Sequence, residues 1–193
     1  QDCCFAEAGA YTGEISVLML VDLRVKMCLV GHSERRNLFF DSDKKVHAKL
    51  TLLLKHHIKP ILCIGESLAV RSSNNTLHFL QQQLTTALTG VSLEQALQLV
   101  IAYEPLWAIG TGRSANPVQI QQLIMQLRRF LADRFSQFIA ERIPIMYGGS
   151  VDPQNASHFL RQSDIDGLLV GGASLNYQSF VQIINCVGDD DKN

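Results

Sequence analysis

Residues 143–150 read Ile-Pro-Ile-Met-Tyr-Gly-Gly-Ser, an apolar run that ends in a glycine pair. Residues 167–174, Gly-Leu-Leu-Val-Gly-Gly-Ala-Ser, repeat this form. Short apolar runs of this kind predict buried strands of a parallel sheet. A single glycine pair is usually only a turn. Two pairs at successive strand ends leave backbone N–H groups accessible and favour a phosphate-binding site.

Similar apolar runs recur along the chain and alternate with longer amphipathic stretches. The predicted strands are Cys3–Ala6, Met27–Val30, Pro60–Ile64, Leu99–Tyr103, Ile143–Tyr147 and Gly167–Val170. Between them, Ser42 is expected to cap one helix, and Asn116-Pro117 to begin another with Gln119 as the capping-box partner. Alternating strands and helices indicate an α/β fold.

Two α/β architectures fit this alternation, an open doubly wound sheet and a (β/α) barrel. The open dinucleotide-binding sheet places Gly-x-Gly-x-x-Gly after its first strand, and the sequence has no such motif there. The glycine pairs instead come late, as in barrels that bind phosphate after their last two strands. We therefore expect one domain over residues 1–193, a TIM (β/α)8 barrel with about six of its eight βα units present.

Composition limits the possible classes of protein. The chain has 193 residues, a net charge of −1 and 47% hydrophobic residues, enough for one sizeable core. Balanced charge without a basic stripe argues against nucleic acid as a partner. No apolar stretch approaches the roughly 18 residues that a membrane span needs, so we expect no membrane partner either.

The cysteines indicate a reducing compartment and no metal. There are five, an odd number, and no pair has the spacing of a zinc site. Cys28 and Cys63 lie in apolar runs, where a reduced cysteine behaves as a small hydrophobe. The opening Gln-Asp-Cys-Cys lacks the basic region of a signal peptide, and we expect a cytoplasmic protein.

One carboxylate stands at the end of a predicted strand. Residues 100–115 read Val-Ile-Ala-Tyr-Glu-Pro-Leu-Trp-Ala-Ile-Gly-Thr-Gly-Arg-Ser-Ala, with Glu104 directly after the apolar run. Pro105 stops the strand, and the glycines free the loop beyond it. A general base shielded by a movable flap needs this arrangement. The alternative is an ordinary strand-to-helix loop with a solvated glutamate.

A histidine follows another predicted strand in the segment Gly31–Arg36, which reads Gly-His-Ser-Glu-Arg-Arg. The positive end of a helix dipole at this point would favour a neutral imidazole, which can donate a hydrogen bond to a substrate carbonyl. The alternative for His32 is a structural pairing with a carboxylate. The other histidines fall in helical patterns, and no His-Glu-x-x-His is present.

These segments resemble the triosephosphate isomerase family in order and spacing. The matching stretches are Gly31–Arg36, Ala102–Gly112, Tyr147–Val151 and Val170–Leu175. Tyr11–Ser16 is similar to the family's third loop, which forms its dimer, with Thr12, Gly13 and Glu14 at its centre. The resemblance runs from residue 1 to about residue 186.

The resemblance implies a role for each matching residue. Glu104 would shuttle a proton between two carbons of a triose phosphate, and His32 would polarise its carbonyl. The family is a well-known case of a glutamate base beside a neutral histidine, so this assignment comes from the resemblance alone. Ser33 would hold Glu104 in the open state, Glu34 would support the pair from behind, and Tyr147 would latch the lid. The implied phosphate ligands are Gly110, Ser150, Gly171 and Gly172. The implied lid residues are Pro105, Leu106, Trp107, Ala108, Ile109, Thr111 and Gly112.

The implied activity is cofactor-free interconversion of dihydroxyacetone phosphate and glyceraldehyde 3-phosphate by a homodimer of glycolysis and gluconeogenesis. The family supplies an Asn and a Lys from its first βα unit, and no residue here matches them. We expect residues 1–193 to lack the first two units of the family barrel. Two other functions stay open. One is a non-catalytic, phosphate-binding and self-associating fragment. The other is a different phosphosugar enzyme, against which His32 and Glu104 argue.

Overall fold

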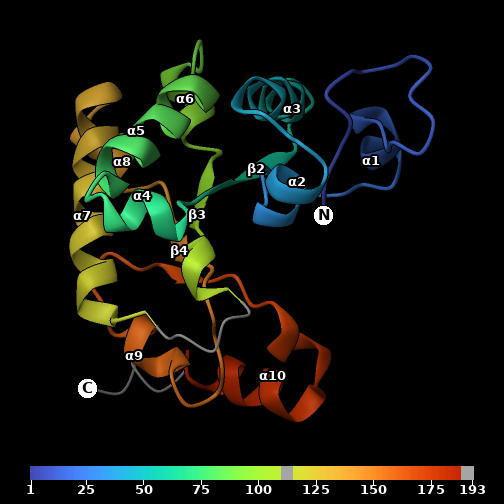
Figure 1. Cartoon of the computed structure of the whole chain (residues 1–193). Helices are drawn as coiled ribbons and strands as arrows, with labels where there is room; N and C mark the ends of the chain where they lie inside the picture. The colour runs from blue at the N-terminus through green and yellow to red at the C-terminus, as the bar shows by residue number, and fades with distance from the viewer. Residues whose placement is uncertain (110–114, 188–193) are drawn as a thin grey trace.

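The computed structural model describes residues 1–109 and 115–187, and five strands in these ranges form one parallel sheet (Figure 1). The strands are β1 (Met27–Val30), β2 (Lys59–Ile64), β3 (Val100–Tyr103), β4 (Ile145–Tyr147) and β5 (Gly167–Leu168). Each strand pairs with the next one along the chain, so spatial order equals sequence order. The predicted α/β class is confirmed.

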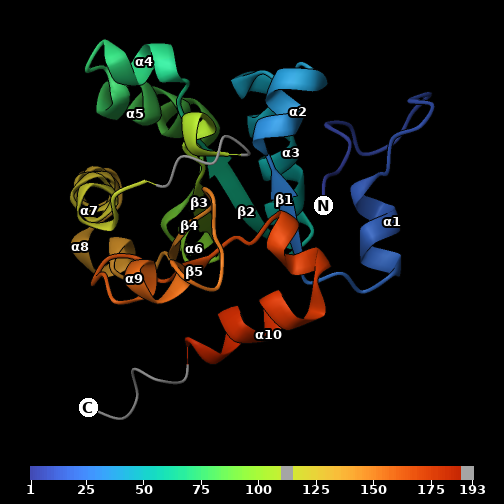
Figure 2. The same cartoon turned by 60° about the horizontal axis from the view of Figure 1, so that its bottom comes forward.

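Helices connect the strands. They are α1 (Val17–Asp22), α2 (Ser33–Leu38), α3 (Asp43–Lys55), α4 (Leu68–Ser72), α5 (Thr76–Ala87), α6 (Leu93–Ala96), α7 (Pro117–Arg134), α8 (Gln137–Ala140), α9 (Ala156–Leu160) and α10 (Tyr177–Asn185). Two 3₁₀ turns, η1 (Leu106–Ala108) and η2 (Gly172–Leu175), follow β3 and β5. Helices α3, α5 and α7 line the outer face of the curved sheet (Figure 2).

The helix caps follow the sequence with one exception. The Ser42 side chain accepts the N–H of Lys45 and begins α3. Asn116 accepts the N–H groups of Val118 and Gln119 ahead of α7. Gln119 was expected to complete a capping box, but its side-chain oxygen instead accepts from Arg71, 3.2 Å away. The helix therefore begins where predicted, while one of the polar partners differs.

The central strands β2 and β3 are buried on both faces, as their unbroken apolar character predicts. On the outer face, Leu62 and Ile101 join the main core with the helices. On the inner face, Ile61, Cys63 and Ala102 belong to a second, smaller cluster. Successive residues of a strand point to opposite faces, so β2 and β3 supply both clusters.

The prediction of six strands was wrong by one. Residues 3–6 form no strand, although Cys3 and Cys4 are buried. Their apolar character reflects this burial. The backbone contact of the segment is a bond from the Cys4 N–H to the Ile15 oxygen, 2.8 Å long, which joins it to a loop. A strand requires a neighbouring strand for its ladder of hydrogen bonds, and β1 pairs with β2 alone among the described elements.

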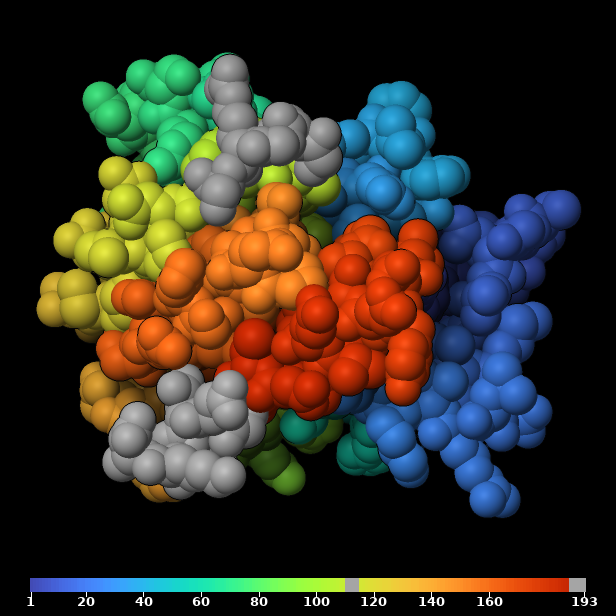
Figure 3. Space-filling view, turned by 90° about the horizontal axis from the view of Figure 1, so that it is seen from below, coloured from blue at the N-terminus to red at the C-terminus, as the bar shows by residue number. Residues whose placement is uncertain are grey.

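The sheet is not closed within the described residues, because β1 and β5 form its two edges. Apolar side chains are exposed near both edges. They are Leu18, Met19, Leu23 and Met27 beside β1, and Leu175, Tyr177 and Ile184 after β5. The space-filling view shows the C-terminal segment, orange to red, next to the N-terminal segment in blue (Figure 3). Contiguous exposed apolar surface is typical of faces that contact further protein.

All five cysteines are free thiols, and Cys186 alone is not buried. No helix in residues 1–109 and 115–187 combines the length and hydropathy needed to cross a membrane. Over the same ranges, no group of three or more His, Cys, Asp or Glu side chains is arranged to hold a metal ion.

Candidate active site

The loops that follow the strands converge on one cavity of about 800 Å³. Parallel strands end at the same edge of a sheet, so residues directly after them meet there. The predicted site residues that line this cavity are His32, Glu34, Glu104, Ile109, Ser150, Gly171 and Gly172. Gln1 and Asp2 lie on its wall as well. A volume of this size suits a small organic ligand.

Glu104 lies at the floor of the cavity, with 2% of its surface exposed. Its Oε2 atom accepts the backbone N–H of Ser33 at 2.9 Å, and its Oε1 atom lies 3.0 Å from Nε2 of His32. These two contacts give hydrogen-bond partners to a carboxylate that is buried away from water. The predicted partner Ser33 thus acts through its amide, so the hydroxyl is not what holds the carboxylate.

The backbone fixes the orientation of the His32 ring. His32 is the N-cap of α2, and its Nδ1 atom accepts the N–H of Glu34 at 3.3 Å. Only an unprotonated nitrogen can accept this bond, so the neutral ring carries its proton on Nε2. That nitrogen faces Glu104. Glu34 contributes through its backbone, and its side chain is exposed.

The pKa of His32 shifts in the direction opposite to the one expected from the start of a helix alone. The hydrogen bond with Glu104 raises the pKa of His32 above its ordinary value, against the opposing effect of burial, and the charges of Glu104 and Glu34 add to the rise. The effect of the Glu104 carboxylate on the pKa of His32 is therefore larger than the effect of the N-terminal turn of α2. The sequence did not reveal this, because it does not show how close the two side chains come.

Cys63 near the end of β2 and Gly65 directly after it shape the surroundings of Glu104, and neither of them was assigned to the site from the sequence. A Cβ atom on Gly65 would lie 1.9 Å from the Glu104 carbonyl oxygen, so only glycine allows this approach. The Cys63 thiol faces the carboxylate, and burial together with the charge of Glu104 raises the pKa of Cys63 well above its usual value. The thiol therefore stays protonated. The sequence feature that could have pointed to this part of the site is Gly65-Glu66, a glycine and a charged residue directly after an apolar strand.

Glu66 anchors the first part of the predicted lid. Its Oε1 atom accepts the indole N–H of Trp107 at 2.9 Å and the hydroxyl of Tyr103 at 3.1 Å. The guanidinium of Arg71 covers the Trp107 ring at 4.1 Å. Burial raises the pKa of Glu66, and the bonds from Trp107 and Tyr103 oppose that rise.

The predicted lid is described only as far as Ile109, after Pro105 and the η1 turn (Leu106–Ala108). The predicted phosphate ligand Gly110 and the lid residues Thr111 and Gly112 lie outside the described residues.

Tyr147, the predicted latch, is fully buried at the end of β4. Its ring stacks on Phe159 with centroids 4.0 Å apart. Its hydroxyl oxygen has no hydrogen-bond partner within the described residues, and a Cβ on Gly149 would lie 2.1 Å from it. A buried hydroxyl without a partner costs folding free energy, because it gives up its hydrogen bonds to water.

Replacing Tyr147 with phenylalanine is expected to leave the folded state as stable as before or slightly more stable. The hydroxyl removed has no partner here, and deleting an unsatisfied buried polar atom removes its desolvation cost. If the hydroxyl latches the lid, kcat/KM falls about tenfold or more, as for loss of a hydrogen bond of about 1.4 kcal/mol. Thermal unfolding and steady-state kinetics measure the two effects. A clear fall in the melting temperature with unchanged kinetics would assign the hydroxyl a structural role.

The predicted phosphate ligands Gly171, Gly172 and Ser150 come together at the cavity. Gly171 and Gly172 line the cavity, and at each a Cβ would have no protein atom within 4 Å. Gly172 begins the η2 turn, and the first N–H groups of a helical turn have no partner inside it. Ser150, after β4, lines the same cavity.

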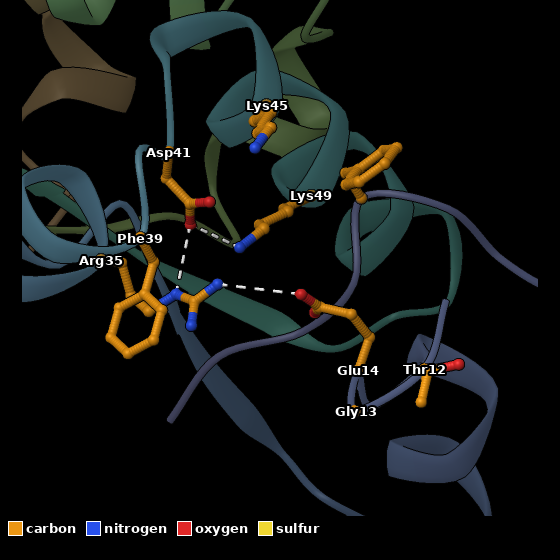
Figure 4. A pocket seen from close by; sticks show the side chains of 9 residues that line it. Thr12, Gly13, Glu14, Arg35, Phe39, Asp41, Lys45 and Lys49 are labelled. Carbon is orange, nitrogen blue, oxygen red and sulfur yellow. Dashed lines mark hydrogen bonds and ion pairs between the residues drawn. The ribbon is translucent and has the colours of Figure 1, made fainter. Parts of the chain in front are cut away.

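A smaller cavity of about 260 Å³ lies beside the predicted dimer loop, and Thr12, Gly13 and Glu14 line part of it (Figure 4). Arg35 Nη2 lies 3.9 Å from a carboxylate oxygen of Glu14. Its Nε atom lies 3.4 Å from Asp41, which also accepts a bond from Lys49. The first contact holds the centre of the loop, at Glu14, close to α2, and the other two join α2 to α3 through Asp41.

Lys49 is almost fully buried at this point, with 1% of its side chain exposed. Burial lowers the pKa of Lys49, but the hydrogen bonds with Asp2 and Asp41 outweigh it and raise the pKa above the ordinary value. The lysine is therefore charged and paired, and it stabilises the contact between the N-terminal segment and α3.

Comparisons with known proteins agree with this geometry. A family model described as "Triosephosphate isomerase" matches residues 1–187. A triosephosphate isomerase of Caldanaerobacter subterraneus is 46% identical over 185 residues, which cover 96% of this chain and 75% of the relative. Those of Thermoanaerobacter pseudethanolicus and Alkaliphilus oremlandii are 46% and 45% identical over the same shares. The chain thus spans about three quarters of the length of these relatives. It belongs to the triosephosphate isomerase family.

Proposed function

We propose that Glu104 and His32 transfer the proton in this chain, which is a triose-phosphate isomerase by family. The reaction interconverts dihydroxyacetone phosphate and D-glyceraldehyde 3-phosphate, a step of glycolysis and gluconeogenesis. The observation that carries the proposal is the buried Glu104 carboxylate, 3.0 Å from His32 Nε2 on the floor of the cavity. A non-catalytic, phosphate-binding role is not favoured.

The geometry supports a cycle that needs only these two side chains. Glu104 removes a proton from the carbon next to the substrate carbonyl, and the carbonyl oxygen accepts a hydrogen bond from His32 Nε2. The negative charge that develops on that oxygen is stabilised by the donor already facing it. His32 gives its Nε2 proton to that oxygen and takes up the proton of the neighbouring hydroxyl, which moves the negative charge to the second oxygen. Glu104 then delivers a proton, either the one it removed or one exchanged with solvent, to the carbon that carried the original carbonyl. One base therefore serves both half-reactions, and the site is restored without a cofactor.

Glu104 must leave its resting partners to reach a substrate. In the described state, both of its oxygens are occupied by Ser33 and His32. We propose that closure of the lid exchanges these contacts for the substrate carbon. During closure Trp107 would leave Glu66, and the Tyr147 hydroxyl would gain a partner from the lid. Exclusion of water protects the enediolate intermediate, which can otherwise eliminate phosphate.

The experiment that tests the reaction follows hydrogen in heavy water. Isomerisation through an enediol places deuterium from the solvent on one carbon of the product, and proton NMR detects the lost signal and the new coupling pattern. Incubation of the protein with either triose phosphate in D₂O is expected to give labelled product. Because a shielded base can also return the hydrogen it removed, the outcome that rules Glu104 out is product formed at an unchanged rate by Glu104→Gln, whose amide cannot accept the proton.

We propose that Ser150, Gly171 and Gly172, with Gly110, hold the substrate phosphate through backbone N–H groups and a hydroxyl. The geometry that supports this is the open space over both glycines and the start of η2 beside them. Backbone amides at a helix start suit a dianion, because they donate hydrogen bonds and carry the positive end of the dipole.

Replacing Gly172 with valine is expected to raise the KM for triose phosphates about 10- to 100-fold, the cost of one lost bond to a charged group. Inhibition by inorganic phosphate should weaken by a similar factor. A Cβ at position 172 meets no protein atom within 4 Å, so we expect the substitution to change phosphate binding and not the stability of the fold. Gly167→Ala at the other end of β5 is the control, since its Cβ meets only Met146 at ordinary distance. Equal phosphate inhibition in Gly172→Val and the parent would remove Gly172 from the site.

We further propose that the chain forms a homodimer through the loop Tyr11–Ser16. Tyr11 and Ile15 of this loop are exposed apolar residues, with 41% and 52% of their surface accessible. The ion pair of Arg35 with Glu14 holds the centre of the loop in place, and Tyr11 and Ile15 on either side stay exposed for contact with a second copy. Apolar, partly rigid loops of this kind suit a permanent interface.

A further inference from the structure

Arg36 is the one member of the motif Gly31–Arg36 that reaches the ends of two strands at once. Its Nε atom donates to the Gly31 carbonyl at 2.7 Å, and its Nη2 atom donates to the Cys63 carbonyl at 3.2 Å. Its Nη1 atom lies 2.6 Å from Asp43, at the start of α3. Only 12% of the side chain is exposed. The guanidinium therefore joins the C-terminal ends of β1 and β2.

Both carbonyls lie close in sequence to the residues that move the proton. Gly31 directly precedes His32, and its φ of 73° places the chain in a conformation that glycine favours. Cys63 precedes Ile64, whose carbonyl accepts the backbone N–H of Glu104 at 2.7 Å. One guanidinium thus holds the backbone next to His32 and the strand that supports Glu104.

The neighbouring Arg35 has a different task. It pairs with Asp2, Glu14 and Asp41 and so fixes the N-terminal segment, as Figure 4 shows for Glu14 and Asp41. The two adjacent arginines therefore point to different parts of the fold. Of the two arginines, only Arg36 contacts the ends of β1 and β2. His32 follows β1, and Ile64 in β2 accepts the backbone N–H of Glu104.

We propose that Arg36 is a positioning residue for proton transfer, whose planar fork sets the separation between the His32 ring and the Glu104 carboxylate. The inference rests on the proposed function of that pair. Arginine presents several N–H donors in fixed directions, so it can hold two carbonyls and a carboxylate together. Lysine has one charged nitrogen on a flexible stem and cannot reproduce this geometry.

Arg128 provides a matched control at the opposite edge of the sheet. Its side chain is 13% exposed and donates to the carbonyls of Ala140, Ile143 and Asp164 at 2.7, 3.1 and 3.1 Å. These residues precede β4 and β5. Arg128 therefore forms the same kind of carbonyl clamp, far from the cavity, at the end where barrels of this class are stabilised rather than active.

The test compares Arg36→Lys with Arg128→Lys in the protein labelled with ¹⁵N-histidine. NMR follows the titration of His32, assigned by loss of its signals in His32→Asn. Glu104 and Glu34 are the charged groups that raise the pKa of His32. If Arg36 sets the separation, Arg36→Lys moves the His32 midpoint down toward the ordinary histidine value. Arg128→Lys leaves the midpoint in place, although both variants lower the melting temperature.

Kinetics supply a second readout. Arg36→Lys is expected to lower kcat about 10- to 100-fold with little change in KM, because misplacement by about 1 Å can cost 100-fold. In Arg36→Ala, guanidinium chloride far below denaturing concentration is expected to restore part of kcat. An unchanged His32 midpoint in Arg36→Lys, or an equal shift in Arg128→Lys, overturns the proposal. Failure of the proposed function and failure of the Arg36 proposal give different results. If the proposed function is wrong, the unsubstituted protein shows no turnover. The His32 midpoints in the two lysine variants still decide the role of Arg36.

Discussion

Replacement of Glu104 by aspartate is expected to lower kcat about 100-fold while KM changes little. The shorter side chain withdraws the carboxylate by about 1 Å, and a displacement of that size can cost two orders of magnitude in rate. The backbone cannot follow, because the Glu104 N–H is bonded to Ile64 and its carbonyl is packed against Gly65. Steady-state kinetics in both directions measure the effect.

The control for this variant is Glu141→Asp on an exposed position after α8, where the same shortening touches only the contact with Gln137. Its kinetics should equal those of the parent. Aspartate at position 104 with unchanged kcat would falsify the assignment of Glu104 as the base. A rise in KM with unchanged kcat would instead give the carboxylate a binding role.

Residues 1–193 expressed on their own are expected to turn over at least about 100- to 1,000-fold more slowly than the Caldanaerobacter relative. The family lysine has no counterpart in this range, and loss of one electrostatic donor to the transition state costs about 2.7–4 kcal/mol. The open edges β1 and β5 and the exposed apolar residues beside them add to the loss. The same surfaces should make the isolated chain self-associate.

A truncated relative and a fusion protein test whether the absent first part of the barrel causes the loss of activity. The Caldanaerobacter relative, cut to the part that aligns with this chain, should lose activity to the same extent. Fusion of the relative's preceding segment to residue 1 should restore turnover and close the sheet. Light scattering reports the size of each species. A monodisperse monomer of residues 1–193 with turnover within about tenfold of the relative would contradict the prediction, and another group would then replace the lysine.

The sequence predicted the centre of the site because of a rule of parallel sheets. Glu104 and His32 each follow a strand directly, and the carboxyl ends of such strands meet at one edge. Their type and position were therefore sufficient to expect them together. The glycines at 171 and 172 were predictable for the same reason. The helix starts at Ser42 and Asn116 followed from local capping chemistry, which depends on few neighbours.

The remaining features depend on distances that the sequence does not contain. Ser33 holds Glu104 through its amide, which every residue type except proline has, so side-chain identity carried no signal. Glu66 binds Trp107 across 41 positions of sequence, and local patterns do not reach that far. The pKa of His32 follows from its separation from Glu104, not from the helix start beside it.

The misassigned strand at residues 3–6 has a related cause. An apolar run shows that a segment is buried, but a strand also needs a neighbour to pair with. Cys3 and Cys4 are buried, but no neighbouring strand pairs with them among the described residues. Strand prediction from apolar character is therefore safest in the middle of a sheet, as for β2 and β3, where both neighbours are supplied by the chain itself.

The order of the strands has a consequence for how the molecule folds. Every strand pairs with its immediate successor, so no ladder of the described sheet joins distant parts of the chain. Each ladder encloses a single βα unit, from 21 positions between Met146 and Gly167 to 44 between Ile101 and Ile145, so pairing closes a loop of one unit and not of the whole chain. The growing chain can add each strand and helix to the unit before it during synthesis, as domains do when they fold from the N-terminal side. Nucleation can thus begin at the paired centre, β2 with β3, and spread outward in both directions.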